Sequence, residues 1–276
     1  RTPEGTAGFL AVGDVARKYP FAKSELQAFM DLAQKLGAVF TSLRRQDFLR
    51  RQEHLAELGR LAAGLAHEIR NPLGAIWGAV QVLESPQAQE LDETARREFF
   101  QVIAQEVHRL IRVVVDFLEY ARPGSAAEPP EPMELHETLH RMMPLLAAAL
   151  GDVPLDFRPA PEPLRIAMDP DRLRQVLLNL LLNARDAVAG VPSPRVEMMT
   201  GRRENSVILE ISDNGCGIPP DRIPQVFLPF FTTKDGGTGL GIPICVRLME
   251  SARGRLSIDS KPGRTVDLLS WPPPQP

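Results

Sequence analysis

The sequence predicts a multidomain protein in which an all-α antiparallel helical hairpin, paired with a second copy into a dimeric four-helix bundle, precedes an α/β sandwich. Three observations predict this architecture. The chain has 276 residues, which exceeds the usual size of one domain. Two long amphipathic patterns occupy its first half, and a proline-rich segment separates them from a second half in which short strand-like and helical patterns alternate.

Composition narrows the class of protein. Apolar residues make up 43% and charged residues 24%, which is typical of a globular chain. A net charge of -3 lacks the basic field of a nucleic-acid binder, so no nucleic-acid partner is expected. Cys216 and Cys245 are too few for a disulfide framework, and the apolar runs are too short for a membrane segment in this chain. We therefore expect a cytoplasmic localisation.

The first helical pattern is very long. A short strand is expected at Gly8–Asp14, Ser24 is a candidate N-cap, and apolar residues then recur at helical spacing from Leu26 to Leu83. Pro72 should weaken or kink this helix. The clearest apolar stripe comprises Leu58, Ala62, Leu65, Ile69, Leu73, Ile76, Val80 and Leu83.

A turn at Ser85–Leu91 separates this helix from a second one, for which Asp92 is the expected N-cap. The second helix carries its own apolar stripe, formed by Ile103, Val107, Leu110, Val114, Phe117 and Ala121. A single hairpin leaves such stripes half covered, and two copies packed as a four-helix bundle cover them. The sequence therefore predicts a homodimer.

The segment Arg122–Pro132 breaks the helical periodicity and is the predicted domain linker. After it, helices are expected at His136–Leu150, Pro170–Ala189 and Leu240–Arg253. Strands are expected at Arg195–Thr200, Ser206–Ser212, Arg255–Ser260 and Thr265–Ser270. This mixture indicates the α/β sandwich.

His67 is the first candidate for chemistry. It lies two positions from both Leu65 and Ile69, so it should turn away from the apolar stripe into solvent. An accessible imidazole can accept a phosphoryl group if a neighbour takes its proton, and Glu68 is the nearest candidate base. Asn71 follows one helical turn later. The alternative is a solvated surface histidine without a role.

Two further motifs suggest a nucleotide. Asn179 and Asn183 lie one turn apart in an apolar helix, and their amide oxygens suit Mg²⁺. Each could instead be a buried asparagine satisfied by backbone groups. Asp213 ends a strand before two glycines and could accept a hydrogen bond from an adenine amino group, or could simply belong to a hairpin turn.

A glycine-rich segment precedes the last expected helix. Backbone amides of glycines 236, 237, 239 and 241, together with a helix N-terminus, can hold phosphate oxygens, and the loop can close as a lid. It is not a Walker loop, because GxxxxGK followed by Ser or Thr is absent. A glycine-rich loop also has ordinary structural explanations.

In order along the chain, the motifs HEIRNP, NLLLNARDA, DNGCGIP, FLPFFTTK and GGTGLG resemble the H, N, G1, F and G2 boxes of sensor histidine kinases. The resemblance covers about residues 46–273. It implies a HisKA dimerisation and phosphotransfer domain followed by a GHKL ATPase domain with the Bergerat fold. It also implies ATP and Mg²⁺ as cofactors and a response-regulator receiver domain as partner.

The resemblance assigns roles to residues. It implies that His67 is the phosphoacceptor, that Glu68 is its base, and that Asn71 serves dephosphorylation of the partner. Asn183 matches the magnesium ligand and Asp213 the adenine-binding aspartate. The expected nucleotide-binding set is Asn179, Asn183, Asp186, Asp213, Gly215, Gly217, Lys234, Gly237, Thr238, Gly239, Leu240 and Gly241.

The expected domains are a remnant of a GAF-like sensor domain with a signalling helix at 1–42, HisKA at 43–125 and the ATPase domain at 126–276. The N-terminal part implies an upstream sensor domain. Pro243 and the short segment Lys261–Trp271 depart from the family pattern, and we expect them to weaken ATP binding or stability.

The alternative function is a catalytically impaired dimeric scaffold or a phosphatase-biased protein. ATPases of the chaperone or mismatch-repair kind and serine-directed kinases of the same fold lack the HEIRNP hairpin.

Overall fold

The computed structural model describes residues 22–86, 92–121, 131–234 and 236–273. The strand expected at Gly8–Asp14 and most of the predicted turn and linker lie outside the described residues. The chain divides into two compact units, residues 1–62 and 63–276. None of the helices in the described part of the chain has an apolar stretch that could cross a membrane.

Helix α1 (Lys23–Glu84) contains the boundary between the two units. It begins one residue before Ser24, so the prediction of Ser24 as N-cap is wrong. The Glu25 carboxylate instead accepts a hydrogen bond from the amide of Ala22 at 2.7 Å. In the first unit, α1 carries large exposed apolar side chains, among them Leu26, Met30, Leu36, Phe40 and Leu43.

Helix α1 remains helical through Pro72, which is buried. The expected weakening therefore does not end the helix at this point. A proline inside a helix removes one backbone hydrogen bond, and in a helix of 62 residues the flanking turns keep their own bonds. Packing of the buried ring compensates for part of the loss.

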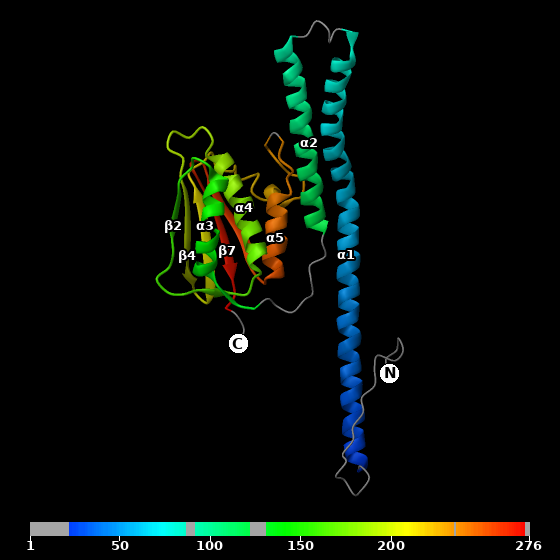
Figure 1. The fold of residues 1–276 in the computed structure, drawn as a ribbon. Coiled ribbons are helices and arrows are strands. Elements are labelled where there is room, and N and C mark those ends of the chain that lie inside the picture. The colour runs from blue at the N-terminus through cyan, green and yellow to red at the C-terminus, as the bar shows by residue number, and fades with distance from the viewer. Residues whose placement is uncertain (1–21, 87–91, 122–130, 235, 274–276) are drawn as a thin grey trace. The chain divides into compact units, whose positions relative to one another are not determined.

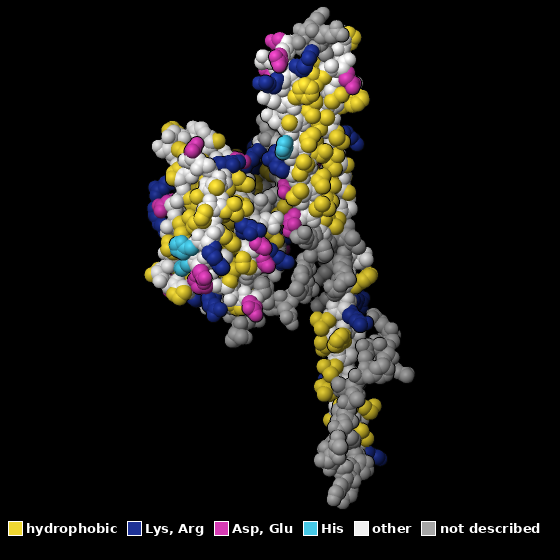
Figure 2. Space-filling model, in the orientation of Figure 1, with side chains coloured by type: hydrophobic (Ala, Val, Ile, Leu, Met, Phe, Trp, Pro, Cys, Tyr) yellow, Lys and Arg dark blue, Asp and Glu magenta, His cyan; other side chains and the backbone are white. Residues whose placement is uncertain are grey.

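In the second unit, the end of α1 runs antiparallel to α2 (Glu93–Ala121) (Figure 1). Asp92 caps α2 as predicted, because its carboxylate accepts a hydrogen bond from the amide of Ala95 at 2.7 Å. Hydrophobic side chains gather over this hairpin (Figure 2). Several are more exposed than a single chain would normally leave them, including Leu73, Trp77, Ile111, Val115 and Leu118.

The predicted apolar stripes are therefore only partly covered. Leu73, Val107 and Val114 belong to them and are 48%, 40% and 38% exposed. Val113 and Tyr120 are buried instead. A stripe left open in one chain is what pairing with a second copy would cover.

The rest of the second unit is an α/β sandwich (Figure 1). Its sheet has the strand order β2-β4-β5-β7-β6, in which β2 and β4 are parallel and the other neighbours antiparallel. The strands are β2 (Leu155–Arg158), β4 (Val196–Arg203), β5 (Ser206–Asp213), β6 (Arg255–Lys261) and β7 (Arg264–Trp271). A separate antiparallel pair joins β1 (Met133–Glu134) to β3 (Arg165–Ile166).

Three helices cover one face of this sheet: α3 (Leu135–Leu150), α4 (Pro170–Ala187) and α5 (Gly241–Ser251) (Figure 1). A short 3-10 helix, η2, spans Gln225–Phe227. Alternate residues of the central strands β5 and β7 face the helices and are buried, as the period of two requires. The apolar core lies between this face and the three helices.

The long strands and the helices of this part confirm the predicted elements to within a few residues. The short strands β1, β2 and β3 were not predicted. Pro243 does not interrupt α5, because it lies in the first turn, where a proline costs no hydrogen bond within the helix. The short segment after Lys261 forms a full hairpin, since β6 and β7 pair from Arg255↔Ser270 to Lys261↔Arg264 across a two-residue turn.

Helix α3 allows a matched test of this packing. Leu146 is fully buried, whereas its neighbour Leu145 is 48% exposed. We expect Leu146→Ala to lower the free energy of unfolding by about 2–5 kcal/mol, because it leaves a cavity, and Leu145→Ala to change it by about 0.5 kcal/mol or less. Urea unfolding followed by the fluorescence of buried Trp271 would measure both. Equal losses would contradict the assigned core.

Candidate active site

His67 lies on the outside of the hairpin. Its side chain is 69% exposed, as its position relative to the apolar stripe predicted. Asn71, one turn further along α1, places its Nδ2 atom 3.4 Å from Nδ1 of His67. The contact holds the ring at Nδ1 and leaves the Nε2 side of the imidazole open to an incoming group.

Glu68 lies between His67 and α2. Its Oε1 atom is 4.0 Å from Nδ1 of His67, too far for a hydrogen bond, and its Oε2 atom is 3.4 Å from Nη2 of Arg109. The Arg109 side chain also approaches Glu106 at 3.9 Å. Sequence reasoning missed Arg109, because only the packing of α2 on α1 brings it to Glu68.

Helix α4 positions the polar side chains of the nucleotide-binding set. Asp169 caps it by accepting hydrogen bonds from the amides of Asp171 and Arg172, and Pro170 occupies the first helical position. Because the start of α4 is fixed in this way, the positions of Asn179, Asn183 and Asp186 around the helix are fixed as well. Asn183 and Asp186 come together at Lys234, whose Nζ donates to Asn183 Oδ1 and to Asp186 Oδ2, both at 2.9 Å.

The Lys234 ammonium also sets the charge at this point. Burial raises the pKa of Asp186, but the hydrogen bond and charge of Lys234, helped by Arg185, outweigh it and hold this pKa below its usual range. Asn179 is placed differently. Its amide Nδ2 lies 3.5 Å from the carbonyl of Gly241, so it links α4 to the start of α5.

Asp213 ends β5 and is 7% exposed. The loop that follows it is docked on α4, because the amide of Cys216 donates to the carbonyl of Ala187 at 3.0 Å. Gly215 allows this approach: a Cβ atom there would lie 2.5 Å from that carbonyl oxygen. Farther on, Gly217 passes equally close to the carbonyl of Lys261.

The glycine-rich segment leads into α5. Gly237 lies against the Thr232 hydroxyl, and Gly239, with φ +65°, lies where a Cβ atom would be 2.5 Å from the Phe230 carbonyl carbon. Leu240 precedes Gly241, and its side chain is fully buried, so only its backbone can serve a ligand. The Thr238 hydroxyl donates to Asp116 of α2 at 2.7 Å, a contact that sequence reasoning did not predict.

A second carboxyl group lies near Asp213. Asp267 on β7 is 6% exposed, and burial, followed by the nearby Asp213 charge, raises its pKa to about 7. Burial raises the pKa of Asp213 as well, although the Gly215 amide and Lys234 oppose this shift. Sequence reasoning missed Asp267. The signal was present, because Asp267 falls on the inward-facing positions of an alternating strand, with Thr265, Leu269 and Trp271.

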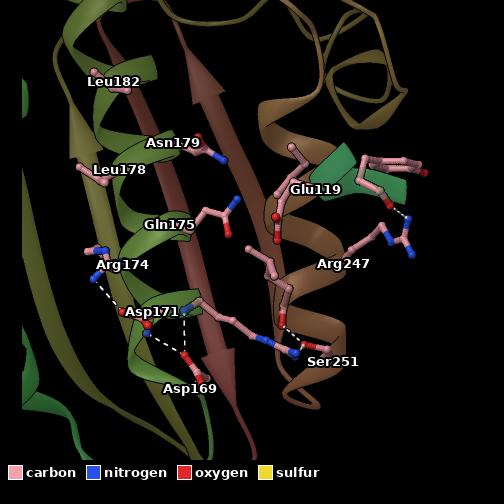
Figure 3. A pocket seen from close by; sticks show the side chains of 14 residues that line it. Glu119, Asp169, Asp171, Arg174, Gln175, Leu178, Asn179, Leu182, Arg247 and Ser251 are labelled. Carbon is pink, nitrogen blue, oxygen red and sulfur yellow. Dashed lines mark hydrogen bonds and ion pairs between the residues drawn. The ribbon is translucent and has the colours of Figure 1, made fainter. Parts of the chain in front are cut away.

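A groove of about 640 Å³ opens elsewhere, between α4, α5 and the end of α2 (Figure 3). Of the predicted site residues it contains only Asn179. Its basic side chains have partners: Arg172 donates to Ser251 at 3.0 Å, and Arg174 lies 2.7 Å from Asp171. The groove is therefore distinct from the region where Lys234 bonds Asn183 and Asp186 and acts on the charge of Asp213.

The oxygen atoms of Asn183 and Asp186 suit a magnesium ion bound together with a nucleotide better than a metal ion held by protein side chains alone. Among the described residues, no group of three or more His, Cys, Asp and Glu side chains could hold a metal ion. Asn183 and Asp186 nevertheless present two hard oxygen atoms to one cation, the Lys234 ammonium. Such a pair could share a magnesium ion whose other ligands are phosphate oxygens and water.

Gly215 provides a stability test of the docked loop. We expect Gly215→Ala to lower the free energy of unfolding by about 1–3 kcal/mol, because the added methyl group overlaps backbone atoms of α4. Gly201→Ala on β4 is the control, since its added Cβ would meet only Ile208 at 3.6 Å. Thermal unfolding of both variants measures the difference. A Gly215→Ala protein as stable as the control would show that the loop is not packed on α4.

Comparison with known proteins gives the family. Residues 57–126 match the His Kinase A (phospho-acceptor) domain, and residues 168–275 match the histidine kinase-, DNA gyrase B- and HSP90-like ATPase domain. The sensor histidine kinase ZraS of Salmonella typhimurium is 36% identical over 231 residues, which cover 82% of this chain and 48% of ZraS. The chain thus spans about half the length of this curated relative.

Solved structures agree with this result. Histidine kinase ThkA in complex with response regulator protein TrrA matches with a TM-score of 0.64 and 27% identity, covering 81% of this chain and 64% of that one. Full-length ShkA in complex with AMPPNP matches with a TM-score of 0.50 and 26% identity, covering 78% and 46%. With the phosphoacceptor and ATPase domains both matched in order, the chain belongs to the sensor histidine kinase family.

Proposed function

We propose that this protein is an ATP-dependent protein-histidine kinase that phosphorylates its own His67 and transfers the phosphoryl group to an aspartate of a response-regulator receiver domain. One observation carries the proposal. An exposed histidine on a helical hairpin occurs in the same chain as an ATPase fold in which Lys234 bonds Asn183 and Asp186 and acts on the charge of Asp213. The ATPase domain alone would not require such a histidine.

The geometry around His67 supports its role as nucleophile. Attack requires the tautomer with the ring proton on Nδ1, in which the Asn71 amide group turns its Oδ1 atom, in place of Nδ2, toward that proton. The Nε2 lone pair then faces solvent and can attack the γ-phosphorus of ATP. The bond from Nε2 to phosphorus forms while the bond to the β,γ-bridging oxygen breaks, and ADP leaves. Glu68 is the nearest carboxylate to the departing ring proton, at 4.0 Å from Nδ1, and a small side-chain rotation would bring it into hydrogen-bond range.

In the ATPase domain, we propose that Asp213 accepts a hydrogen bond from the adenine amino group. The amides of Gly237, Gly239 and Gly241, at the N-terminus of α5, would hold phosphate oxygens, with Thr238 beside them. Gly215 and Gly217 keep the loop beside the base in place, and Asn179 fixes the start of α5. Lys234 lies just before the glycine-rich segment, in the part of the chain that we propose to act as the lid segment, and carries a positive charge that can pair with the phosphates.

We assign the magnesium ion to Asn183, with Asp186 beside it. When bound, Mg²⁺ would supply positive charge that offsets the charge developing on the phosphate oxygens. Lys234 would then release Asn183 and Asp186, because its ammonium group and the metal compete for the same oxygen atoms. The lysine thus connects occupancy of the metal site to the position of the lid.

The exposed apolar face of the hairpin supports a homodimer, in which a second copy covers residues such as Trp77 and Leu118. A response-regulator receiver domain is the proposed acceptor of the phosphoryl group, in keeping with the ThkA–TrrA complex. We place the reaction in the cytoplasm, where ATP is available and the thiols of Cys216 and Cys245 would stay free. An upstream sensor domain would supply the signal through α1.

Asn71 supports a second activity at the same place, dephosphorylation of the response regulator. Its amide already lies one hydrogen-bond length from the His67 ring, on an exposed helical face that a partner can reach. There it could orient a water molecule toward a phosphorylated aspartate of the partner. This assignment leaves the role of His67 as phosphoacceptor unchanged.

The phosphoacceptor can be tested with a second histidine of the hairpin as the control. We expect wild type incubated with Mg²⁺ and γ-labelled ATP to gain an acid-labile label, and His67→Ala to lose at least about 95% of it, because no other nucleophile occupies that position. His108→Ala should keep the label, since His108 is an exposed histidine of α2 whose Nδ1 contacts the Ala104 carbonyl. Label retained by His67→Ala would refute the assignment.

The metal assignment makes a separate prediction. Asn183→Ala should lower autophosphorylation about 100-fold or more, because the metal would lose its protein ligand, while ADP affinity without Mg²⁺ changes less than about threefold. Asn205→Ala, in the turn between β4 and β5, is the control and should behave like wild type. Titration calorimetry with and without Mg²⁺ measures the affinities. An equal loss of ADP affinity under both conditions would assign Asn183 to the nucleotide rather than to the metal.

A further inference from the structure

Asp267 is a buried carboxyl group to which the assigned chemistry gives no role. It is 6% exposed, and within the described residues no hydrogen bond reaches its side chain. A buried carboxylate without a partner is unfavourable, because it has lost its hydration and gained nothing in return. The group must therefore stay protonated, or meet a partner that enters with a ligand.

The sheet register places Asp267 beside Asp213. On the paired strands β5 and β7, Asp267 lies opposite Ile211, and Asp213 lies opposite Thr265. Both aspartates point to the helix-covered face, so their side chains are diagonal neighbours within reach of the same bound group. Asp213 uses Oδ1 to accept from the Gly215 amide at 2.8 Å, and in the described structure its Oδ2 has no partner.

The other groups around Asp267 give it no counter-charge. From β6 it faces Ile258, and from α5 it faces the buried thiol of Cys245, which the Asn179 amide of α4 contacts. Lys234 acts on Asp213. Two carboxyl groups that share a buried site cannot both ionise readily, so the pair retains one proton. Asp213, nearer to a backbone donor and to Lys234, is the better site for the negative charge.

We propose that Asp267 is a specificity-determining residue of the base subsite, holding a proton that it donates to N1 of adenine while ionised Asp213 accepts from the N6 amino group. The inference rests on the proposed binding of ATP at Asp213. Ionised Asp213 as acceptor and protonated Asp267 as donor match the Watson–Crick edge of adenine, which offers a donor at N6 and an acceptor at N1. Guanine offers the opposite order, with an acceptor at O6 and a donor at N1–H.

The proton makes nucleotide affinity depend on pH. Since the bound form needs protonated Asp267, the affinity for ADP should fall as the pH rises above about 7, approaching tenfold per pH unit. Asp267→Asn keeps a donor that does not ionise, so its affinity should stay near the low-pH value of wild type up to pH 9. Asp259→Asn, on the exposed side of β6, should retain the wild-type profile.

The experiment is titration calorimetry of the full chain with Mg-ADP from pH 6.5 to 9.0. Ionisation of the ADP phosphates is common to all three proteins and cancels in the comparison. Wild type should also bind 1-deaza-ADP, in which C–H replaces N1, about tenfold more weakly than ADP at pH 6.5, because one hydrogen bond is lost. The pH series and the analogue need no variant, so they test the proposal even if Asp267→Asn folds poorly.

A wild-type profile that parallels that of Asp267→Asn would overturn the proposal. So would equal affinities of wild type for ADP and 1-deaza-ADP, or loss of ADP binding by an Asp267→Asn protein with an unchanged melting temperature. If neither wild type nor Asp259→Asn binds ADP at any pH, the proposed ATP site itself is wrong. That failure is distinct from the others, in which the nucleotide binds without using Asp267.

Discussion

The candidate nucleotide site depends on one close contact, that between the loop after β5 and the end of α4. The amide of Cys216 donates to the carbonyl of Ala187, and Gly215 leaves no room for a side chain between the two backbones. Because of this contact, Asp213 at the end of a strand and Asn183 and Asp186 at the end of a helix share one region. Neither element alone holds both a group for a base and groups for a cation.

The hairpin is under a different constraint, because two of its faces carry apolar side chains and have different surroundings. One face buries Val113 and Tyr120 within the chain, and another leaves large apolar side chains such as Trp77 open. His67 can therefore occupy a polar position without any cost to packing. The role proposed for His67 requires that a nucleotide and a receiver domain reach it in turn, and an exposed helical position permits both.

Much of this arrangement could be predicted from the sequence, because hydrophobic periodicity fixes the helices and the long strands. The exposure of His67 followed from its place between Leu65 and Ile69, and the cap at Asp92 followed from its residue type. The short strands β1, β2 and β3 were not predicted, because two to four residues are too few to show the alternating apolar pattern of a strand. Arg109 and Asp116 were also missed, since their partners lie far away in sequence and only packing brings them together. Asp267 was missed although it falls on an inward-facing position of an alternating strand.

Lys234 shows how the two halves of the nucleotide site can be coupled. Its ammonium group bridges Asn183 and Asp186 and lowers the pKa of Asp186, and the Thr232 hydroxyl accepts from its backbone amide. The lid segment is thereby tied to α4 through a cation that belongs to the protein. In the proposed function, a magnesium nucleotide would bring its own cation to the same oxygens and its own anions to the lysine. If Lys234 exchanged the oxygens of Asn183 and Asp186 for phosphate oxygens, the lid segment would move. The sheet would stay unchanged, because it contributes only the groups proposed to contact the base.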